Sequence, residues 1–106
     1  MSEQVNIILK ELRRQLEGLY GPRLVQMLLY GSQARGDAEA GSDIDVLVVL
    51  NGAVRPGEEI ARTSDIIAFL SLMHGVVVSR AFVSAERFAH EQSPLLMNVR
   101  REGIAV

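Results

Sequence analysis

Residues 28–50 read LLYGSQARGDAEAGSDIDVLVVL, and this stretch decides the fold. Runs rich in Leu, Val and Ile lie at both ends, and short apolar runs bounded by turn residues predict buried strands. Between the runs lie Gly31 and Ser32, then a spacer of ten residues, then Asp43 and Asp45. The stretch therefore predicts two strands joined by a polar loop, with two acidic residues at the start of the second strand.

The two acidic residues form a candidate metal site. Alternate side chains of a strand point to the same face, so Asp43 and Asp45 are expected on one face, roughly 7 Å apart along the backbone. Adjacent carboxylates repel each other unless one keeps its proton or a cation, water or Arg joins them. Mg²⁺ is commonly held by one or two carboxylates together with substrate phosphates. The alternative is an ordinary turn with Asp43 as a solvated residue, which leaves Asp45 unexplained.

Gly31 and Ser32 end the first predicted strand and are candidates for holding phosphate. Glycine lets the backbone approach a ligand, successive amides at such a bend form an anion nest, and a serine hydroxyl adds a donor. A Walker A loop is excluded, because Gly36 is followed by Asp37 and not by Lys. A calcium-binding EF-hand is excluded too, because the ligand spacing and the bidentate Glu are missing.

The pattern resembles the nucleotidyltransferases of the polymerase-beta-like superfamily, whose signature is Gly-Ser, about ten residues, and Asp-x-Asp. In this chain the signature is Gly31-Ser32-x10-Asp43-Ile44-Asp45, accompanied by Arg35-Gly36-Asp37 and Ser42. The resemblance is specific over residues 24–50 and looser to residue 106. At 106 residues the chain is similar to the minimal nucleotidyltransferases, which consist of the catalytic core alone. The resemblance implies an α/β (α+β) fold with a small mixed sheet flanked by helices.

The resemblance also implies a Mg²⁺-dependent transfer of a nucleoside monophosphate from a nucleoside triphosphate to a hydroxyl. The expected case is transfer of AMP from ATP. It assigns nucleotide binding to Gly31, Ser32, Arg35 and Ser42, and metal binding and catalysis to Asp43 and Asp45. The residues themselves leave two roles open for Arg35: it either binds phosphate or forms an ion pair with Asp37 or Asp43. Ser42 is expected mainly to fix the backbone before Asp43, and Asp37 to cap a turn.

Residues 76–83 form a third predicted strand, and here the chain departs from the family. Superfamily enzymes carry a third carboxylate on this strand, as a metal ligand or as the base for the attacking hydroxyl. The segment VVVSRAFVS contains no acid. Alternation places Ser79 and Ala81 on one face, and we expect Ser79 where the third carboxylate would stand. The loss is expected to weaken catalysis, since general-base help is typically worth about 10²- to 10⁴-fold.

The size and charge of the chain narrow its function further. A length of 106 residues indicates a single domain, residues 1–106, with no room for a separate substrate domain. A net charge of −2 without a run of Lys and Arg argues against direct binding of nucleic acid. No apolar run is long enough to span a membrane, and no signal peptide is recognisable. We therefore expect a cytoplasmic protein, which the absence of cysteine permits.

Helices are expected around the strands. The first is residues 2–19, with Ser2 as N-cap and an apolar face that ends at Leu19. The second is residues 58–74, closed by Gly75 and apolar nearly all round in its second half. Burial in the core is favoured for that half, and pairing with another chain is the alternative. Two short helices, residues 85–91 and 94–102, and an edge strand over residues 104–106 complete the chain.

In the family that the chain resembles, minimal nucleotidyltransferases are commonly antitoxins of HEPN-domain ribonucleases, and some are reported to adenylylate a tyrosine of the toxin. The resemblance therefore implies a HEPN-domain partner as acceptor. The missing third carboxylate keeps a second hypothesis open: a weakened or inactive homologue that neutralises its partner by binding alone. A small-molecule transferase, such as one that modifies aminoglycosides, is less favoured because the chain has no acceptor-binding domain.

Overall fold

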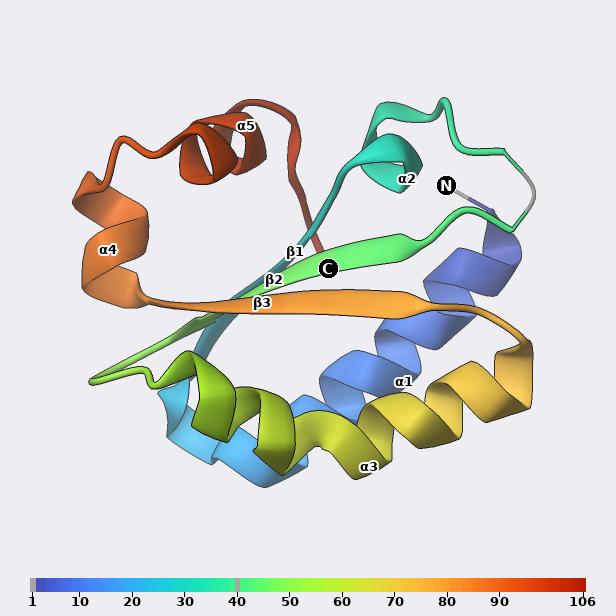
Figure 1. Cartoon of the computed structure of the whole chain (residues 1–106), viewed down its shortest axis with the longest axis horizontal. Helices are drawn as coiled ribbons and strands as arrows, with labels where there is room; N and C mark the ends of the chain where they lie inside the picture. The colour runs from blue at the N-terminus through green and yellow to red at the C-terminus, as the bar shows by residue number, and fades with distance from the viewer. Residues whose placement is uncertain (1, 40) are drawn as a thin grey trace.

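The computed structural model describes residues 2–39 and 41–106, which form helices on both faces of one sheet (Figure 1). In these residues the elements follow in this order: α1 (Glu3–Tyr20), the 3-10 helix η1 (Gly21–Arg23), β1 (Leu24–Tyr30), α2 (Ser32–Arg35), β2 (Ile44–Leu50), α3 (Pro56–His74), β3 (Val78–Ser84), α4 (Ala85–His90), α5 (Pro94–Glu102) and β4 (Ile104–Ala105). No described helix combines the length and apolar character that crossing a bilayer demands.

The strands of the described residues form one mixed sheet in the order β3-β2-β1-β4. β2 runs parallel to β3, whereas β1 is antiparallel to both β2 and β4. Figure 1 shows α1 and α3 below the sheet, and α2, α4 and α5 above it. The expected α/β architecture, a small mixed sheet flanked by helices, is therefore confirmed.

The alternation of β2 divides the core between the two faces of the sheet. Ile44, Val46 and Val48 pack into the cluster that contains the buried residues of α1 and α3. Leu47 and Val49 pack into a second cluster, which contains the buried residues of α5. Because alternate residues of a strand share a face, Asp45 belongs to the face of Leu47 and Val49. The strand therefore carries Asp45 toward α2 and α5, away from α1 and α3.

Helix α1 begins and packs almost as its sequence predicts. The Ser2 hydroxyl accepts a hydrogen bond from the Val5 amide at 3.1 Å, which confirms the expected N-cap. The apolar face ends one residue later than expected, because Tyr20 is buried whereas Leu19 is 40% exposed. The Tyr20 hydroxyl donates to buried Glu59 at 2.8 Å, so the tyrosine fills the core and also satisfies a buried carboxylate.

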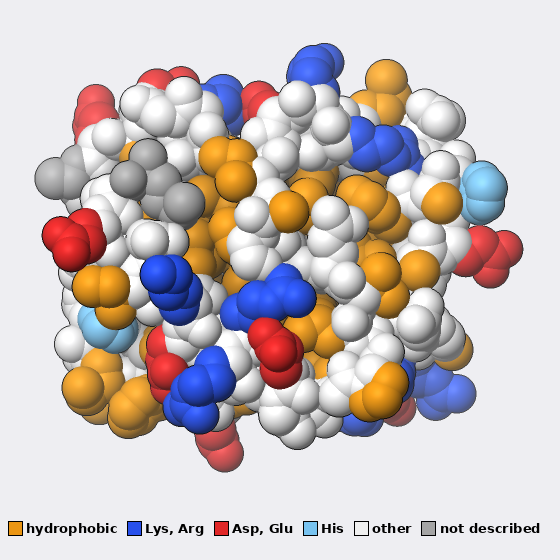
Figure 2. Space-filling model, turned by 180° about the vertical axis from the view of Figure 1, so that it is seen from behind, with side chains coloured by type: hydrophobic (Ala, Val, Ile, Leu, Met, Phe, Trp, Pro, Cys, Tyr) orange, Lys and Arg blue, Asp and Glu red, His pale blue; other side chains and the backbone are white. Residues whose placement is uncertain are grey.

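Helix α3 contradicts the expectation that its apolar second half is buried. Ile67 and Leu70 are buried, but Phe69, Leu72 and Met73 are 53%, 87% and 63% exposed. The helix packs on the sheet and α1 with one side only, because no further layer lies beneath it (Figure 1). Figure 2 shows hydrophobic side chains on the surface at the end of α3, beside a histidine. The core assignment of these three residues is therefore wrong.

The C-terminal segment returns to the sheet as expected. The hydroxyls of Ser84 and Ser93 cap α4 and α5, and β4 pairs with β1 through Leu29 and Ile104. The turn after α5 depends on Gly103, where an added Cβ would overlap the carbonyl oxygen of Val99. The glycine is thus required for a close backbone approach, and it fixes the end of α5 above the sheet.

Candidate functional site

The bend after β1 is held by its own backbone. Gly31 has φ +75° and ψ −156°, a conformation that residues with a Cβ rarely adopt. Its carbonyl oxygen accepts hydrogen bonds from the amides of Ala34 and Arg35, each at 3.1 Å. Ser32 therefore opens a short helix, α2, where the sequence indicated only a loop. The turn keeps Gly31 and Ser32 at the end of β1, next to the start of β2.

Asp45 lies directly against this bend. It is the strand partner of Tyr30 in β1 and of Ser79 in β3. An ideal Cβ at residue 31 would lie 2.6 Å from Oδ2 of Asp45, so the glycine leaves the space that the carboxylate occupies. The structure thus brings the Gly-Ser bend and the second acidic residue together, as the sequence led us to expect.

The two acidic side chains share one electrostatic environment. Burial raises the pKa of Asp45, the charge of Asp43 raises it further, and the charge of Arg35 opposes both. Asp43 is exposed and lies just before β2, which begins at Ile44. The sequence predicted that this strand starts at Asp43, so the predicted strand is one residue too long at its N-terminal end. The pair combines a solvated carboxylate at the rim with a half-buried one behind it.

Arg35 is held by two carboxylates. Its Nε lies 3.2 Å from Oδ2 of Asp37, and its Nη1 lies 3.3 Å from Oε1 of Glu102 at the end of α5. Of the two roles left open by the sequence, the structure shows the ion pair, with Asp37 as the anticipated partner. Glu102 is a residue of the site that the sequence analysis missed, because it is 67 positions away and no spacing pattern connects it to Arg35.

Ser42 fixes the backbone before the acidic pair. Its hydroxyl accepts a hydrogen bond from the Glu39 amide at 3.0 Å, and its own amide donates to the Glu39 carbonyl at 3.0 Å. Gln33 donates from its side chain to the Ser42 carbonyl at 3.4 Å. The expected backbone role of Ser42 is confirmed, and Gln33 is a second supporting residue that the sequence did not reveal.

The residue of β3 that pairs with Asp45 has no carboxyl group. Ser79 is the strand partner of Asp45, and Ala81 is opposite Leu47, so Ser79 is the residue of β3 next to Asp45, as the alternation led us to expect. Asp65 cannot take this place, because it is exposed on α3, which packs on the opposite face of the sheet. Among the described residues, no group of three or more His, Asp or Glu side chains gathers in a way that could hold a metal.

Arg80 does not join the site. Its Nε donates to the Thr63 hydroxyl at 2.7 Å, and its Nη2 donates to the Ile60 carbonyl at 2.8 Å. Both partners belong to α3, so the guanidinium faces that helix. Arg80 therefore joins β3 to α3.

The donor set of the acidic pair fits a hard divalent cation. Two carboxylates whose charges disfavour each other gain from a cation between them, and the absence of a Cβ at Gly31 lets the Asp45 carboxylate lie against the Gly-Ser bend. Mg²⁺ typically retains waters and takes further oxygen ligands from substrate phosphates. Asp43 and Asp45 could therefore hold Mg²⁺ only in combination with a phosphate-bearing ligand or water.

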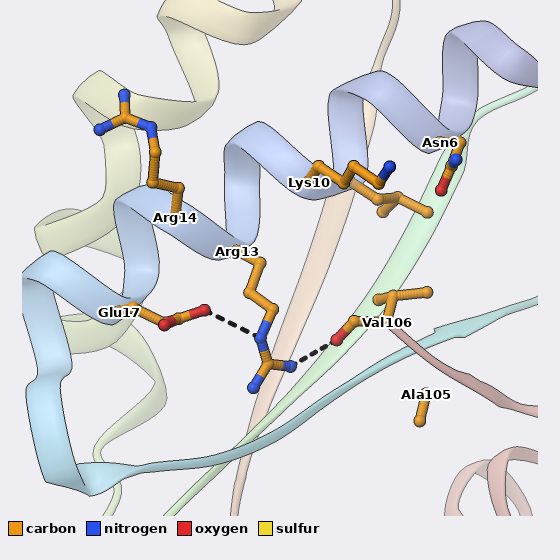
Figure 3. Close-up of a pocket in the computed structure, with 8 residues that line it drawn as sticks. Asn6, Lys10, Arg13, Arg14, Glu17, Ala105 and Val106 are labelled. Atoms are coloured by element: carbon orange, nitrogen blue, oxygen red, sulfur yellow. Dashed lines mark hydrogen bonds and ion pairs between the residues drawn. The ribbon is translucent and has the colours of Figure 1, made fainter.

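A cavity of about 360 Å³ lies elsewhere, between α1 and the C-terminal segment. Figure 3 shows Arg13 reaching across it, from the Glu17 carboxylate to the carbonyl oxygen of Val106. Lys10 and Arg14 also line it, but none of the residues singled out as the site does. A smaller cavity, of about 290 Å³, is lined by Gln33 and Ser42 and adjoins the loop before Asp43. Of these two cavities, the smaller one lies next to the loop that leads to the acidic pair.

The chain is similar to known proteins over most of its length. The family described as the nucleotidyltransferase domain matches residues 8–104. A relative from Methanocaldococcus jannaschii that carries the name of a protein adenylyltransferase is 36% identical over 80 residues, 76% of this chain and 74% of the relative.

Two solved structures share the fold at low sequence identity. One, from Sulfolobus solfataricus and named a nucleotidyltransferase, superposes with a TM-score of 0.65 at 20% identity, over 97% of this chain and 82% of that one. The other, a toxin–antitoxin with AMP-PNP, gives 0.61 at 22% identity, over 95% of this chain and 70% of that one. With the family match covering nearly all of its length, this chain belongs to the nucleotidyltransferase domain family.

Proposed function

We propose that this protein transfers AMP from ATP to a hydroxyl group of a partner protein, with Mg²⁺ as the metal. The observation that carries the proposal is the contact between Gly31 and Asp45, with Asp43 beside it. A phosphate chain lying on the Gly-Ser bend would meet the carboxylate pair directly. The name of the Methanocaldococcus relative supports a protein as acceptor, and the toxin–antitoxin structure with AMP-PNP supports a nucleotide as donor.

In the proposed reaction, the hydroxyl oxygen of the acceptor forms a bond to the α-phosphorus of ATP. The bond between that phosphorus and the oxygen bridging to the β-phosphorus breaks, and pyrophosphate leaves with the electron pair. The hydroxyl proton passes to solvent, because Ser79 offers no carboxylate beside Asp45. The protein contributes mainly by positioning the reactants and by fixed charge.

The proposed roles follow from the contacts of each residue. The backbone at Gly31 and Ser32 holds the phosphates, and Ser42 keeps Asp43 in place through the Glu39 turn. Arg35 exchanges one of its carboxylate partners for a phosphate oxygen. When bound at Asp43 and Asp45, Mg²⁺ would supply positive charge against the phosphate oxygens and the leaving pyrophosphate.

We propose a HEPN-domain protein as the partner, with this chain as its antitoxin in the cytoplasm. Support comes from the toxin–antitoxin structures that share the fold, together with the resemblance to antitoxin nucleotidyltransferases. The alternative, a homologue that neutralises its partner by contact alone, is favoured by one observation: the missing carboxylate at Ser79. Both hypotheses require the same fold, and they differ in whether Asp43 and Asp45 are needed.

The test is to incubate the chain with a candidate HEPN-domain partner, Mg²⁺ and ATP labelled at the α-phosphate. We expect label on the partner, none with Asp45→Asn or Asp43→Asn, and none when the label is on the γ-phosphate. Transfer that persists in Asp45→Asn would exclude this site. Partner inhibition that survives both substitutions, without any label transfer, would establish the binding-only alternative.

A further inference from the structure

A third cavity, of about 260 Å³, lies on the face of the sheet that α4 and α5 cover. The sheet contributes Leu47, Ala81 and Val83 to its lining, and α5 contributes Leu95 and Leu96. We call this cavity the β3 pocket, because every lining residue except Leu47 belongs to β3, to α4 or α5, or to the turn between these two helices. Most of its lining is apolar.

The polar residues that line the β3 pocket already have partners within the chain. Arg87 donates from Nε to Oε1 and from Nη2 to Oε2 of Glu91, each at 2.9 Å, so the two charges offset each other. The Ser93 hydroxyl accepts a hydrogen bond from the Leu96 amide at 3.4 Å. Pockets for whole small molecules typically measure about 300–1,000 Å³. The β3 pocket is smaller than this, and it suits a single uncharged, apolar side chain.

The β3 pocket begins close to the acidic pair, on the same face of the sheet. Tyr30, Asp45 and Ser79 form one row across β1, β2 and β3. Leu47 and Ala81 form the next row on this face, two residues further along β2 and β3, which is a distance of about 7 Å. Figure 1 shows α4 and α5 over one end of the sheet and α2 over the other. The pocket therefore lies one row beyond Asp45, toward α4 and α5.

The proposed reaction determines the side from which the acceptor approaches. In a displacement at phosphorus, the entering and leaving oxygens lie roughly in line. The leaving pyrophosphate is proposed to lie on the bend at Gly31 and Ser32, at the end of β1. Because β2 lies between β1 and β3, the acceptor oxygen enters from the β3 side, over Ser79. The ribose is attached to an oxygen outside this line, which leaves the β3 side to the acceptor.

The geometry of β3 favours an extended acceptor segment. Among the strands of the described residues, β3 is an edge strand, and its seven residues pair with β2 in unbroken register. The free side of an edge strand can pair with an extended segment of another protein. In such a segment, alternate side chains point the same way about 7 Å apart, which matches the spacing from Ser79 to Ala81. A hydroxyl side chain over Ser79 would therefore have its second neighbour over the β3 pocket.

We propose that the β3 pocket is a specificity subsite for the acceptor: it receives an apolar side chain two residues from the hydroxyl that accepts AMP. The acceptor segment lies extended along β3. This inference rests on the proposed function, because it takes ATP as the donor and a protein as the acceptor. It adds the sequence context of the acceptor, namely an apolar residue at the second position before or after the hydroxyl residue.

The test measures kcat/KM for labelling of a candidate HEPN-domain partner, with Mg²⁺ and ATP labelled at the α-phosphate. The pocket variant is Ala81→Leu, whose larger side chain fills the β3 pocket. Its matched control is Ala68→Leu, at an exposed alanine of α3 on the opposite face of the sheet. We expect a loss of roughly 10- to 100-fold with the pocket variant, the range that a hydrophobic pocket typically supplies, and no loss with the control.

Two measurements show that the pocket variant keeps a working site. The thermal shift given by Mg²⁺ and AMP-PNP should be the same in Ala81→Leu and in the wild type. N-acetyltyrosinamide has a hydroxyl but no second neighbour, so both proteins should label it at the same slow rate. Leu95→Gln is a second pocket variant at a leucine that is 42% exposed, and its loss should have the same direction. It decides the test if Ala81→Leu melts well below the wild type.

A double-mutant cycle separates the β3 pocket from a general effect on the site. Mass spectrometry identifies the labelled residue of the partner, and the apolar residue two positions away is changed to Gly. This change should lower labelling by the wild type to about the level of Ala81→Leu. It should have little further effect in Ala81→Leu, because two groups that act through one contact are not additive.

Four results would overturn the inference. The first is full labelling by both pocket variants while Asp45→Asn abolishes it, which leaves the proposed function standing. The second is a smaller AMP-PNP thermal shift in Ala81→Leu than in its control, which would place the nucleobase in the pocket. The third is a labelled residue without an apolar residue at either second position. The fourth is the absence of label on the partner with the wild type, which would remove the proposed function and the inference with it.

Discussion

Gly31 and Asp45 are in contact in a way that admits no side chain at residue 31: an added Cβ would lie 2.6 Å from Oδ2 of Asp45. The backbone at Gly31 also has a positive φ of 75°. Two independent requirements therefore fix glycine at this position. One is conformational, and the other is the space taken by the carboxylate.

Gly31→Ala is expected to destabilise the fold by about 2–4 kcal/mol, because backbone strain of roughly 1–3 kcal/mol adds to the overlap with Asp45. Gly36→Ala is the matched control, since Gly36 has φ +80° but nothing within 4 Å of an added Cβ. It should cost only about 1 kcal/mol. Urea denaturation measures both values. Asp45→Ala should recover part of the loss in Gly31→Ala, and equal losses in the two glycine variants would contradict the contact.

Asp45→Asn is expected to stabilise the ligand-free protein at neutral pH. The pKa of Asp45 is raised by burial and by Asp43, so the folded state binds its proton more tightly than the unfolded state does. Stability is then lost as the pH rises from the unfolded pKa through the folded one. Because Asp45 remains partly exposed, the gain should stay below about 1 kcal/mol. Thermal melts of both proteins between pH 3 and pH 8 test this. We expect the stability of Asp45→Asn relative to wild type to increase from low pH to pH 7. A relative stability that decreases over this range would contradict the direction of the pKa shift.

Arg35 and Glu102 should have opposite effects on nucleotide binding. Arg35→Gln removes a guanidinium proposed to bind phosphate and should weaken AMP-PNP binding about tenfold or more. Glu102→Gln removes a competing carboxylate that lies 3.3 Å from Arg35, so it should strengthen binding. Neither should change the free energy of unfolding by more than about 1 kcal/mol, since the ion pairs are largely exposed. Calorimetric titration measures both affinities, and a change in the same direction for both variants would refute the role of Arg35.

Ser79→Asp should restore the third carboxylate, because Ser79 is the strand partner of Asp45. We expect the Mg²⁺ concentration that half-saturates the nucleotide-dependent thermal shift to fall roughly tenfold, which corresponds to about 1.4 kcal/mol. Ala81→Asp is the control. It faces Leu47 in an apolar cluster, so it should destabilise the fold by about 1–3 kcal/mol without tighter metal binding. Equal Mg²⁺ dependence of Ser79→Asp and wild type would show that residue 79 is outside the metal site.

The sequence predicted the parts of the site that depend on neighbouring strands. Gly31 ends one strand and Asp45 lies near the start of the next, so antiparallel pairing of β1 and β2 brings them together once the alternation is known. The face that Ser79 shares with Ala81 could likewise be predicted from the alternation of β3, whereas its pairing with Asp45 is given by the structure. Arg35 and Glu102 could not be linked in this way, since their contact depends on how α5 folds back over the sheet.

The errors in the helices have a common physical origin. Periodicity identifies an apolar side chain but not whether a second layer covers it, which is why Phe69 and Leu72 were expected in the core. At the end of α1, Leu19 and Tyr20 both fit the helical spacing after Leu16. The choice between them is made by Glu59 on α3, which is buried and takes the tyrosine hydroxyl as its donor.

The central claim is that Asp45 and the Gly-Ser bend bind one nucleotide together with Mg²⁺. Its most direct test is the thermal shift of the wild type and of Asp45→Asn with AMP-PNP, with and without Mg²⁺. At a ligand concentration of 100 times Kd, binding should add about 2.7 kcal/mol, or roughly 10 °C for a chain of this size. We predict this shift for the wild type only with Mg²⁺, and none for Asp45→Asn. An equal shift in both proteins, or one independent of Mg²⁺, would contradict the claim.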